Sequence, residues 1–180
     1  MTKIAVLVGS LRADSMNKKL ADELEKFAPE GTEFVRLNIS EVPVFNQDHE
    51  NDAPASVKKL KEEIEAADGI LLVTPEYNRG MTGVIKNAID WASRPWGSNS
   101  FLKKPAAITG ATGSPWGTMA AQVELRTVML YLDTVLMAQP ELYIGAINPL
   151  HDEAGVMSDH VKERLGMFIT AFVEHVNKYK

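Results

Sequence analysis

Short runs of apolar residues alternate with amphipathic, helix-like segments along the whole chain, and this alternation limits the possible folds more than any other feature. The run Lys3–Val8 is followed by Ser15–Ala28, in which Leu20, Leu24 and Phe27 recur at helical spacing. Strands that are apolar throughout are typical of parallel sheets covered on both faces. The pattern therefore predicts an α/β fold with helices on both sides of a parallel sheet.

The remaining elements follow in the same alternating order. Four further strands are expected, at Glu33–Leu37, Gly69–Thr74, Pro105–Thr109 and Leu136–Ile144. Pro140 lies inside the last of these strands and favours an edge position for it, because proline has no N–H to donate. The further helices are expected from Pro54, over Val84–Ser93, over Thr118–Asp133 and along the apolar stripe from Val161 to Val176, with Asn38–Asp52 as a long polar loop.

Five strands joined by helical crossovers predict the doubly wound strand order 2-1-3-4-5 in a single domain spanning residues 1–180. Strands 1, 3 and 4 are then neighbours, and the loops at their carboxyl ends meet at one edge of the sheet. These loops are Gly9–Asn17 (loop 1), Pro75–Gly83 (loop 2) and Gly110–Gly117 (loop 3). Ligands bind at this edge in open parallel sheets, so the composition of the loops predicts the chemistry of the site.

Composition excludes several classes of function. The chain has no cysteine, which removes disulfide frameworks, zinc–thiolate sites and cysteine nucleophiles. Its net charge of −5 disfavours general nucleic-acid binding, which needs a basic face. The histidines show no metal-ligand spacing, so no metal site is expected. No apolar run approaches the ~20 residues of a membrane span, and the early run Ile4–Val8 is too short for a signal peptide, so we expect a cytoplasmic protein.

Loop 1 has the composition of a phosphate-binding loop. Ser10, Ser15 and Asn17 provide neutral donors, Arg12 adds a cationic fork, and the following helix would present free N–H groups at its N-terminus. The loop matches neither the P-loop nor the Gly-x-Gly-x-x-Gly pattern. In the alternative interpretation, Ser15 only caps the helix and Arg12 is a surface charge.

Loops 2 and 3 are suited to holding a flat ligand. Loop 2 offers a proline-fixed turn, an aromatic side chain and the amide of Asn78, which together can grip the edge of a polar ring; alternatively, Tyr77 packs in the core of an ordinary turn. The three glycines of loop 3 allow the backbone to approach a ligand closely. Trp116 in loop 3 either stacks on that ligand or fills the space beneath the loop.

Together the loops resemble the NADPH-dependent FMN reductase family, the flavodoxin-like quinone and chromate reductases. The resemblance covers nearly the whole chain, and its motifs are residues 9–21, Pro75-Glu76-Tyr77-Asn78 through Gly80, and Lys86–Trp91. The chain departs from the family at Ser114–Gly117, where members often carry a Gly-Gly pair.

The resemblance implies bound FMN and specific residues around it. The phosphate would be held by Ser10, Arg12, Ser15 and Asn17. The isoalloxazine ring would be surrounded by Pro75, Glu76, Tyr77, Asn78, Thr112, Gly113 and Ser114. NADPH or NADH would pass hydride to the flavin and leave before a quinone or similar small acceptor takes two electrons from the same face. No side chain is expected to act as a catalytic acid or base.

Two further expectations concern Arg79 and the class of protein. Arg79 follows the ring-binding segment, and it either recognises the 2′-phosphate of NADPH or is a solvated surface residue. The main alternative function is a flavodoxin-type electron carrier that binds FMN without nicotinamide turnover. Such carriers usually have a Thr/Ser-rich phosphate loop without arginine, so Arg12 and Arg79 argue against it.

The helix expected over Thr118–Asp133 is apolar around most of its circumference. One stripe can pack on the sheet, and the rest needs a second cover. A two-fold contact with a second copy would supply it, and the family resemblance also implies a homodimer or homotetramer. The alternative is that the Asn38–Asp52 loop or the C-terminal helix covers this stripe within the chain.

Overall fold

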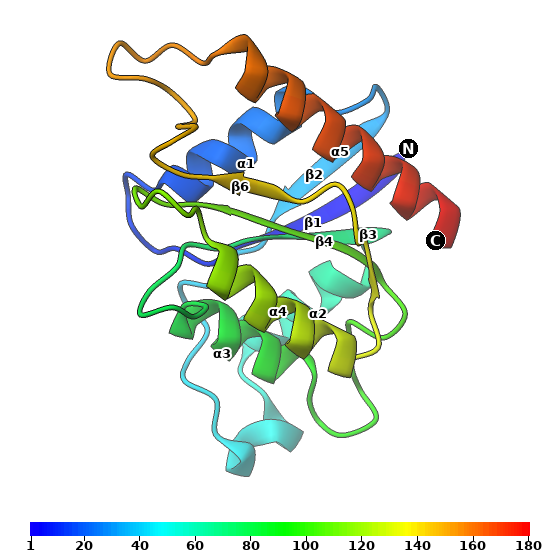
Figure 1. Cartoon of the computed structure of the whole chain (residues 1–180). Coiled ribbons are helices and arrows are strands. Elements are labelled where there is room, and N and C mark those ends of the chain that lie inside the picture. Colours follow the sequence, from blue (N-terminus) through cyan, green and yellow to red (C-terminus); the bar gives the residue numbers. More distant parts are fainter.

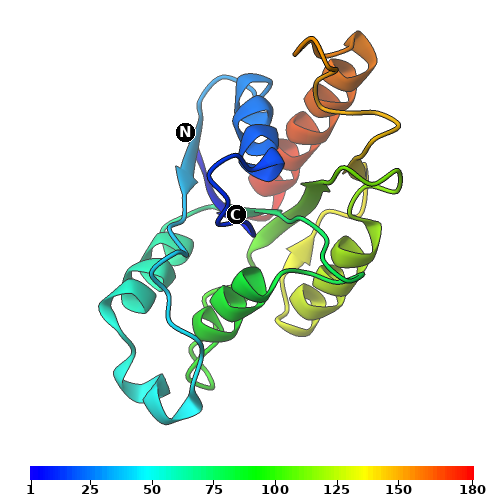
Figure 2. The same ribbon diagram turned by 90° about the vertical axis from the view of Figure 1, so that its left-hand side faces the viewer.

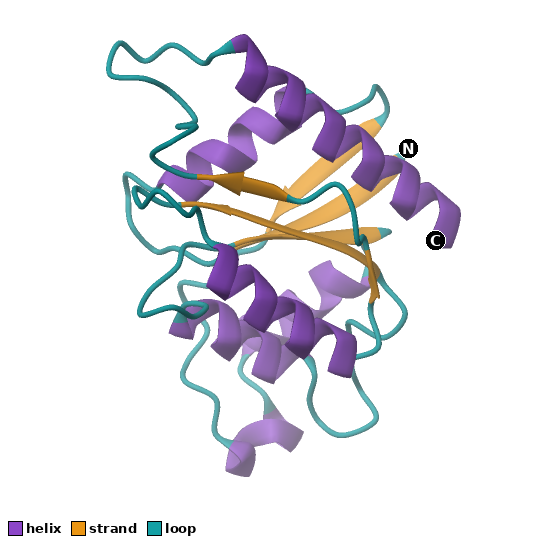
Figure 3. Ribbon diagram, viewed as in Figure 1, coloured by secondary structure: helices purple, strands orange, loops and turns teal.

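A computed structural model describes all 180 residues of the chain. A parallel sheet lies between two layers of helices, as the alternating pattern predicted (Figure 3). The strands are β1 (Thr2–Val8), β2 (Thr32–Arg36), β3 (Gly69–Val73), β4 (Pro105–Ala111), β5 (Val135–Leu136) and β6 (Leu142–Ile144). The α-helices are α1 (Met16–Lys26), α2 (Ala55–Glu65), α3 (Gly83–Ala92), α4 (Met119–Tyr131) and α5 (Asp159–Tyr179).

The strand order is β2-β1-β3-β4-β5, which confirms the predicted doubly wound topology. All neighbouring strands are parallel, with Ile4 of β1 opposite Gly69 of β3 and Ile70 of β3 opposite Ala106 of β4. The two central strands β3 and β4 are buried along their whole length. Burial on both faces explains why the sequence of these strands is apolar without alternation.

The two faces of the sheet are covered by different helices. Helices α1 and α5 pack on one face, while α2, α3 and α4 pack on the other (Figures 1 and 2). The first core contains Leu20 of α1 and Phe168 and Phe172 of α5. The second contains Leu60 of α2 and Ile85 of α3. Each helix therefore buries the stripe that its sequence periodicity predicted.

The fifth strand differs from the prediction of one continuous strand over Leu136–Ile144. The structure has two short strands, β5 and β6, and both pair with β4. β5 lies opposite Pro105 and Ala106, whereas β6 lies opposite Thr109 to Ala111. Pro140 lies in the segment between them, where it cannot donate to the ladder. Neither strand has a partner on its other side, so the predicted edge position is correct.

The long polar segment after β2 also differs from the prediction. It contains a 3₁₀ helix, Gln47–Asp52, capped at its start by the Asn46 side chain, which accepts a hydrogen bond from the Asp48 N–H. The Asn87 side chain of α3 accepts a hydrogen bond at 2.7 Å from the Phe45 N–H, which ties this segment to the helix layer. No helix in the structure is both long and apolar enough to cross a membrane.

Candidate functional site

Loops 1, 2 and 3 meet at the carboxyl edge of β1, β3 and β4, at the end of the sheet on the left of Figure 1. Loops 1 and 2 are joined because the Thr82 hydroxyl donates a hydrogen bond to the Gly9 carbonyl at 2.7 Å. Loops 1 and 3 are joined by Asn17, whose side-chain amide donates to the Ala111 carbonyl at 2.8 Å and accepts from the Ala111 N–H at 2.9 Å. The three loops therefore form one connected structure.

In loop 1, backbone N–H groups collect around the N-terminus of α1. Ser15 is the N-cap, and its hydroxyl accepts hydrogen bonds from the N–H groups of Asn17 and Lys18 at 3.2 and 3.3 Å. The N–H groups of residues 11 and 13–16 donate no hydrogen bond within the chain. Several unpaired donors at a helix N-terminus make a site for an anion, and these donors fit the phosphate of FMN.

The charged residues of loop 1 extend into solvent. Arg12 is exposed, and its guanidinium makes no ion pair within the chain. The Asp14 carboxylate pairs with the Lys19 ammonium, and this hydrogen bond lowers the pKa of Asp14 below its ordinary value. The acidic residue of the loop is thus already neutralised. Arg12 is the cation of the loop that is left to meet a ligand.

Ser10 and Asn17 have structural partners that the sequence did not reveal. The Ser10 hydroxyl is largely buried and accepts a hydrogen bond from the Arg12 N–H at 3.4 Å. The Asn17 side chain is buried and already bonded twice to Ala111. A side-chain amide carries two hydrogens, so only one of them is left for a ligand. The geometry assigns Asn17 first to holding loops 1 and 3 together.

Loop 2 contains a tight turn at its tip. Tyr77 and Gly80 exchange two backbone hydrogen bonds at 3.0 and 3.1 Å. The two central residues, Asn78 and Arg79, both have positive φ, at 53° and 64°, which is the signature of a type I′ turn. The Tyr77 side chain is 55% exposed, so the interpretation of Tyr77 as a core residue is wrong. The turn projects its side chains into solvent.

Two carboxylates fasten loop 2 to α4. Glu76 accepts hydrogen bonds from the N–H groups of Ala120 and Ala121 at 2.9 and 3.2 Å. Because Thr118 makes no side-chain cap, Glu76 supplies the negative charge that the N-terminus of α4 favours. Glu124 accepts a hydrogen bond from the Met81 N–H at 2.6 Å. The sequence did not reveal Glu124, since nothing in its neighbourhood marks a partner 43 residues away.

The fixed turn leaves other backbone donors of loop 2 available. The N–H groups of Glu76 and Asn78 donate no hydrogen bond within the chain. The polar edge of a flavin ring carries oxygen and nitrogen acceptors, so these groups fit the ring contact expected of Pro75–Asn78. The carboxylate of Glu76 faces α4 instead. Glu76 would therefore contact the ring only through its backbone N–H.

Loop 3 is packed against the segment that follows β6. A side chain at Gly145 would collide with this loop, since its Cβ would lie 2.7 Å from the Ser114 carbonyl oxygen. The Ser114 N–H lies 3.5 Å from the Thr112 hydroxyl oxygen, and the Gly113 N–H donates to nothing in the chain. Trp116 is 63% exposed, so it does not fill the space beneath the loop.

A surface pocket of about 680 Å³ lies between loop 2, loop 3 and α4. It is lined by Glu76, Arg79, Trp116, Met119, Ala120, Val123 and Glu124. Arg79 is exposed, and its guanidinium lies 3.5 Å from the Glu76 carboxylate. An exposed indole, aliphatic side chains and one arginine can receive a planar molecule of negative or partly negative character.

The fold and these loops define a class of protein: a flavodoxin-like domain with a site for a phosphate-bearing, flat cofactor. The model of the family described as NADPH-dependent FMN reductase matches residues 2–149. The chain therefore belongs to the NADPH-dependent FMN reductase family. The match confirms the resemblance seen in the sequence motifs, and FMN with NAD(P)H is the cofactor system of this family.

Relatives with similar sequences and structures agree with this assignment. The chain is 46% identical to a 2-hydroxy-1,4-benzoquinone reductase from Burkholderia sp, over 97% of this chain and 96% of that protein. It is 37% identical to a quinone reductase from Pseudomonas putida, over 96% and 94%. The solved structure of FerB, a flavoenzyme NAD(P)H:(acceptor) oxidoreductase from Paracoccus denitrificans, has a TM-score of 0.91, 43% identity and 99% coverage of both chains.

The contact between Glu76 and α4 can be tested by removing the carboxylate. We expect Glu76→Ala to lower the free energy of unfolding by about 1–2 kcal/mol, because two N–H groups at the start of α4 lose their acceptor. Urea denaturation measures the change. The control is Glu62→Ala on the exposed face of α2, which should change stability by less than about 0.5 kcal/mol. Equal effects of the two substitutions would show that Glu76 does not cap α4.

Proposed function

We propose that this protein oxidises NADPH or NADH and passes the electrons, through bound FMN, to quinones or similar small acceptors. The observation that carries the proposal is the set of unpaired N–H groups around the N-terminus of α1 and in loop 2, together with the pocket beside them. Membership of the FMN reductase family and the quinone reductase activity named for the relatives support it. A cytoplasmic location stays a prediction.

The chain would contribute binding and orientation to this reaction. Bound FMN supplies the capacity to accept hydride from a nicotinamide and to release two electrons to an acceptor. Ser10, Ser15 and Arg12, with the N–H groups of loop 1, would hold the phosphate. The N–H groups of Glu76, Asn78 and Gly113 would fix the edges of the ring. No histidine lies in the three loops, and we assign no catalytic acid or base.

The proposed activity is tested directly on the purified protein. A yellow protein with flavin absorbance that oxidises NADPH steadily when a quinone is present is the expected result. A flavodoxin-type carrier would also be yellow, but it would show no steady nicotinamide oxidation. Bound FMN without turnover by either NADPH or NADH would therefore favour the carrier.

Arg12 is expected to strengthen FMN binding. Arg12→Ala removes a charge-assisted hydrogen bond worth roughly 1.5–3 kcal/mol, so FMN affinity should fall by about tenfold to a hundredfold. Fluorescence titration of the apoprotein with FMN measures the affinity. Lys58→Ala is the control, because Lys58 is an exposed cation on α2, away from the loops. The assignment fails if Arg12→Ala and Lys58→Ala bind FMN equally well.

Arg79 is proposed to favour NADPH over NADH. Its exposed guanidinium lines the pocket and can pair with a 2′-phosphate, and the Glu76 carboxylate 3.5 Å away also binds the N-terminus of α4. We expect Arg79→Ala to lower kcat/KM for NADPH by about tenfold and to leave kcat/KM for NADH nearly unchanged. An unaltered ratio of the two efficiencies would identify Arg79 as a solvated surface residue.

We also propose a homo-oligomer that covers the outer face of α4. Val123, Leu130 and Tyr131 are 56%, 62% and 76% exposed, so neither the segment before α2 nor α5 covers this stripe. An apolar helix face of this kind favours a contact with a second copy. Such a contact would run up to Val123, which lines the pocket, and would place the neighbouring copy beside the proposed flavin site.

Light scattering tests the proposed oligomer. The expected mass at micromolar concentration is a multiple of the 19.8 kDa chain. Leu130→Glu should shift the protein toward the monomer, because a charge in an apolar contact has no partner there. Met167→Glu is the matched control, since Met167 is an equally exposed apolar residue on α5. A monomeric mass for the unaltered protein would end this proposal.

A further inference from the structure

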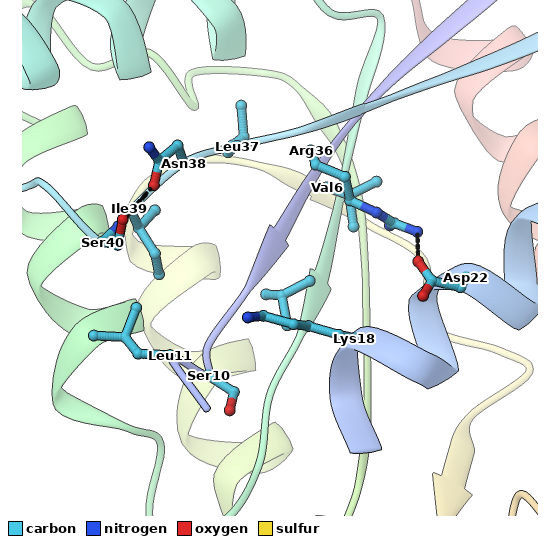
Figure 4. Close-up of a pocket in the computed structure, with 11 residues that line it drawn as sticks. Val6, Ser10, Leu11, Lys18, Asp22, Arg36, Leu37, Asn38, Ile39 and Ser40 are labelled. Atoms are coloured by element: carbon cyan, nitrogen blue, oxygen red, sulfur yellow. Dashed lines mark hydrogen bonds and ion pairs between the residues drawn. The ribbon is translucent and has the colours of Figure 1, made fainter. Parts of the chain in front are cut away.

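A second pocket lies at the carboxyl ends of β1 and β2, beside α1 and on the other side of loop 1 from β3 and β4. Its volume is about 330 Å³, at the lower end of the range of roughly 300–1,000 Å³ that is common for small-molecule sites. Figure 4 shows the residues that line it. Of the side chains assigned to FMN, only Ser10 also lines this pocket, so the pocket adjoins the proposed phosphate site but is otherwise built from different residues.

The walls of the pocket are mainly aliphatic. They are formed by Val6, Val8, Leu11, Leu37 and Ile39. Val6, Leu37 and Ile39 are buried, whereas Leu11 is 52% exposed. A ring packed against these walls would cover the apolar surface that they still expose, which stabilises binding by roughly 25 cal/mol per Å².

The charges around the pocket pair with one another except for one. Arg36 is held by two carboxylates, at 3.0 Å from Asp22 and 2.7 Å from Glu25. Lys18 makes no ion pair or side-chain hydrogen bond within the chain, although it lies one helical turn before Asp22. Its side chain extends from α1 across the pocket, with the ammonium directed toward the apolar wall (Figure 4). Lys18 is therefore the cation of the pocket that has no partner within the chain and can meet a ligand.

The rim opposite α1 is polar and fixed. The Asn38 side-chain carbonyl accepts hydrogen bonds from the Ser40 N–H at 3.1 Å and from the Ser40 hydroxyl at 2.7 Å. This closed turn holds the chain after β2 in place beside the wall residues Leu37 and Ile39. The opening is thus bounded by this hydrogen-bonded turn on one side and by Lys18 on the other.

We propose that this pocket binds a compact organic monoanion, an aromatic monocarboxylate, with the carboxylate on Lys18 and the ring against the aliphatic wall. Lys18 can pair with one carboxylate, and the pocket is large enough for a single ring that carries it. A second negative charge on the ligand would find no further unpaired cation in the pocket, because Arg36 is already held by Asp22 and Glu25.

Benzoate titrated into the FMN-loaded protein tests the site. Bound FMN would occupy the phosphate-binding donors of loop 1, and the Lys18 variant described below distinguishes this pocket from the one beside Arg79. Calorimetry should give a Kd on the order of 1 mM for benzoate and at least tenfold weaker binding for benzamide, the neutral isostere. The flavin absorbance should not change, because a ligand stacked on the ring would perturb it.

Two variants separate the charge from the shape of the pocket. Lys18→Gln should weaken benzoate binding about tenfold, while Lys26→Gln, farther along the same helix and outside the pocket, should leave it unchanged. Ser40→Phe should abolish binding by filling the opening without changing any charge. NADPH oxidation should be unaltered in all three. Equal binding of benzamide, benzoate binding that survives Lys18→Gln, or no benzoate binding at all would each overturn the proposal.

Discussion

The paired hydrogen bonds between the Asn17 side chain and the Ala111 backbone hold the proposed site together. They cross from the first turn of α1 to the last residue of β4, between residues 94 positions apart in the sequence. The contact is buried, so losing either hydrogen bond would leave a polar backbone group without a partner. Through this contact, the N–H groups of loop 1 and those of loop 3 keep a fixed spacing. A cofactor with a phosphate at one end and a ring at the other would need a constant spacing between its two sets of donors.

The strand order and the positions of the loops could be predicted from the sequence because they depend on local patterns. The sequence of β3 is an uninterrupted apolar run, and loop 2 begins with Pro75 two residues after the end of the strand. The partners of the polar side chains could not be predicted in the same way. Glu76 looks like a ligand contact in sequence, yet its carboxylate is bound to α4. The interruption between β5 and β6 was also missed, although Pro140 marked its position.

α4 links the proposed flavin site to the proposed contact between copies. Its N-terminus is fixed by Glu76, and Glu124 on its second turn binds the backbone of loop 2. The same helix exposes Val123 and Leu130 on its outer face. Since a helix moves as a rigid unit, a partner packed on that face would also restrict the turn that carries Asn78 and Arg79.

Much of the proposed ligand contact comes from the backbone, and several side chains of the site serve to hold that backbone in place. The donors in loop 1 are mostly N–H groups that any residue would supply, and the type I′ turn in loop 2 also presents main-chain groups. Side chains such as Asn17, Glu76 and Glu124 act by holding that backbone in position. Their carboxylate and amide groups form hydrogen bonds to the backbone of the protein. The negative charge of Glu76 is offset by the N-terminus of α4 and by Arg79. An acidic side chain can therefore lie beside an anionic cofactor without repelling it.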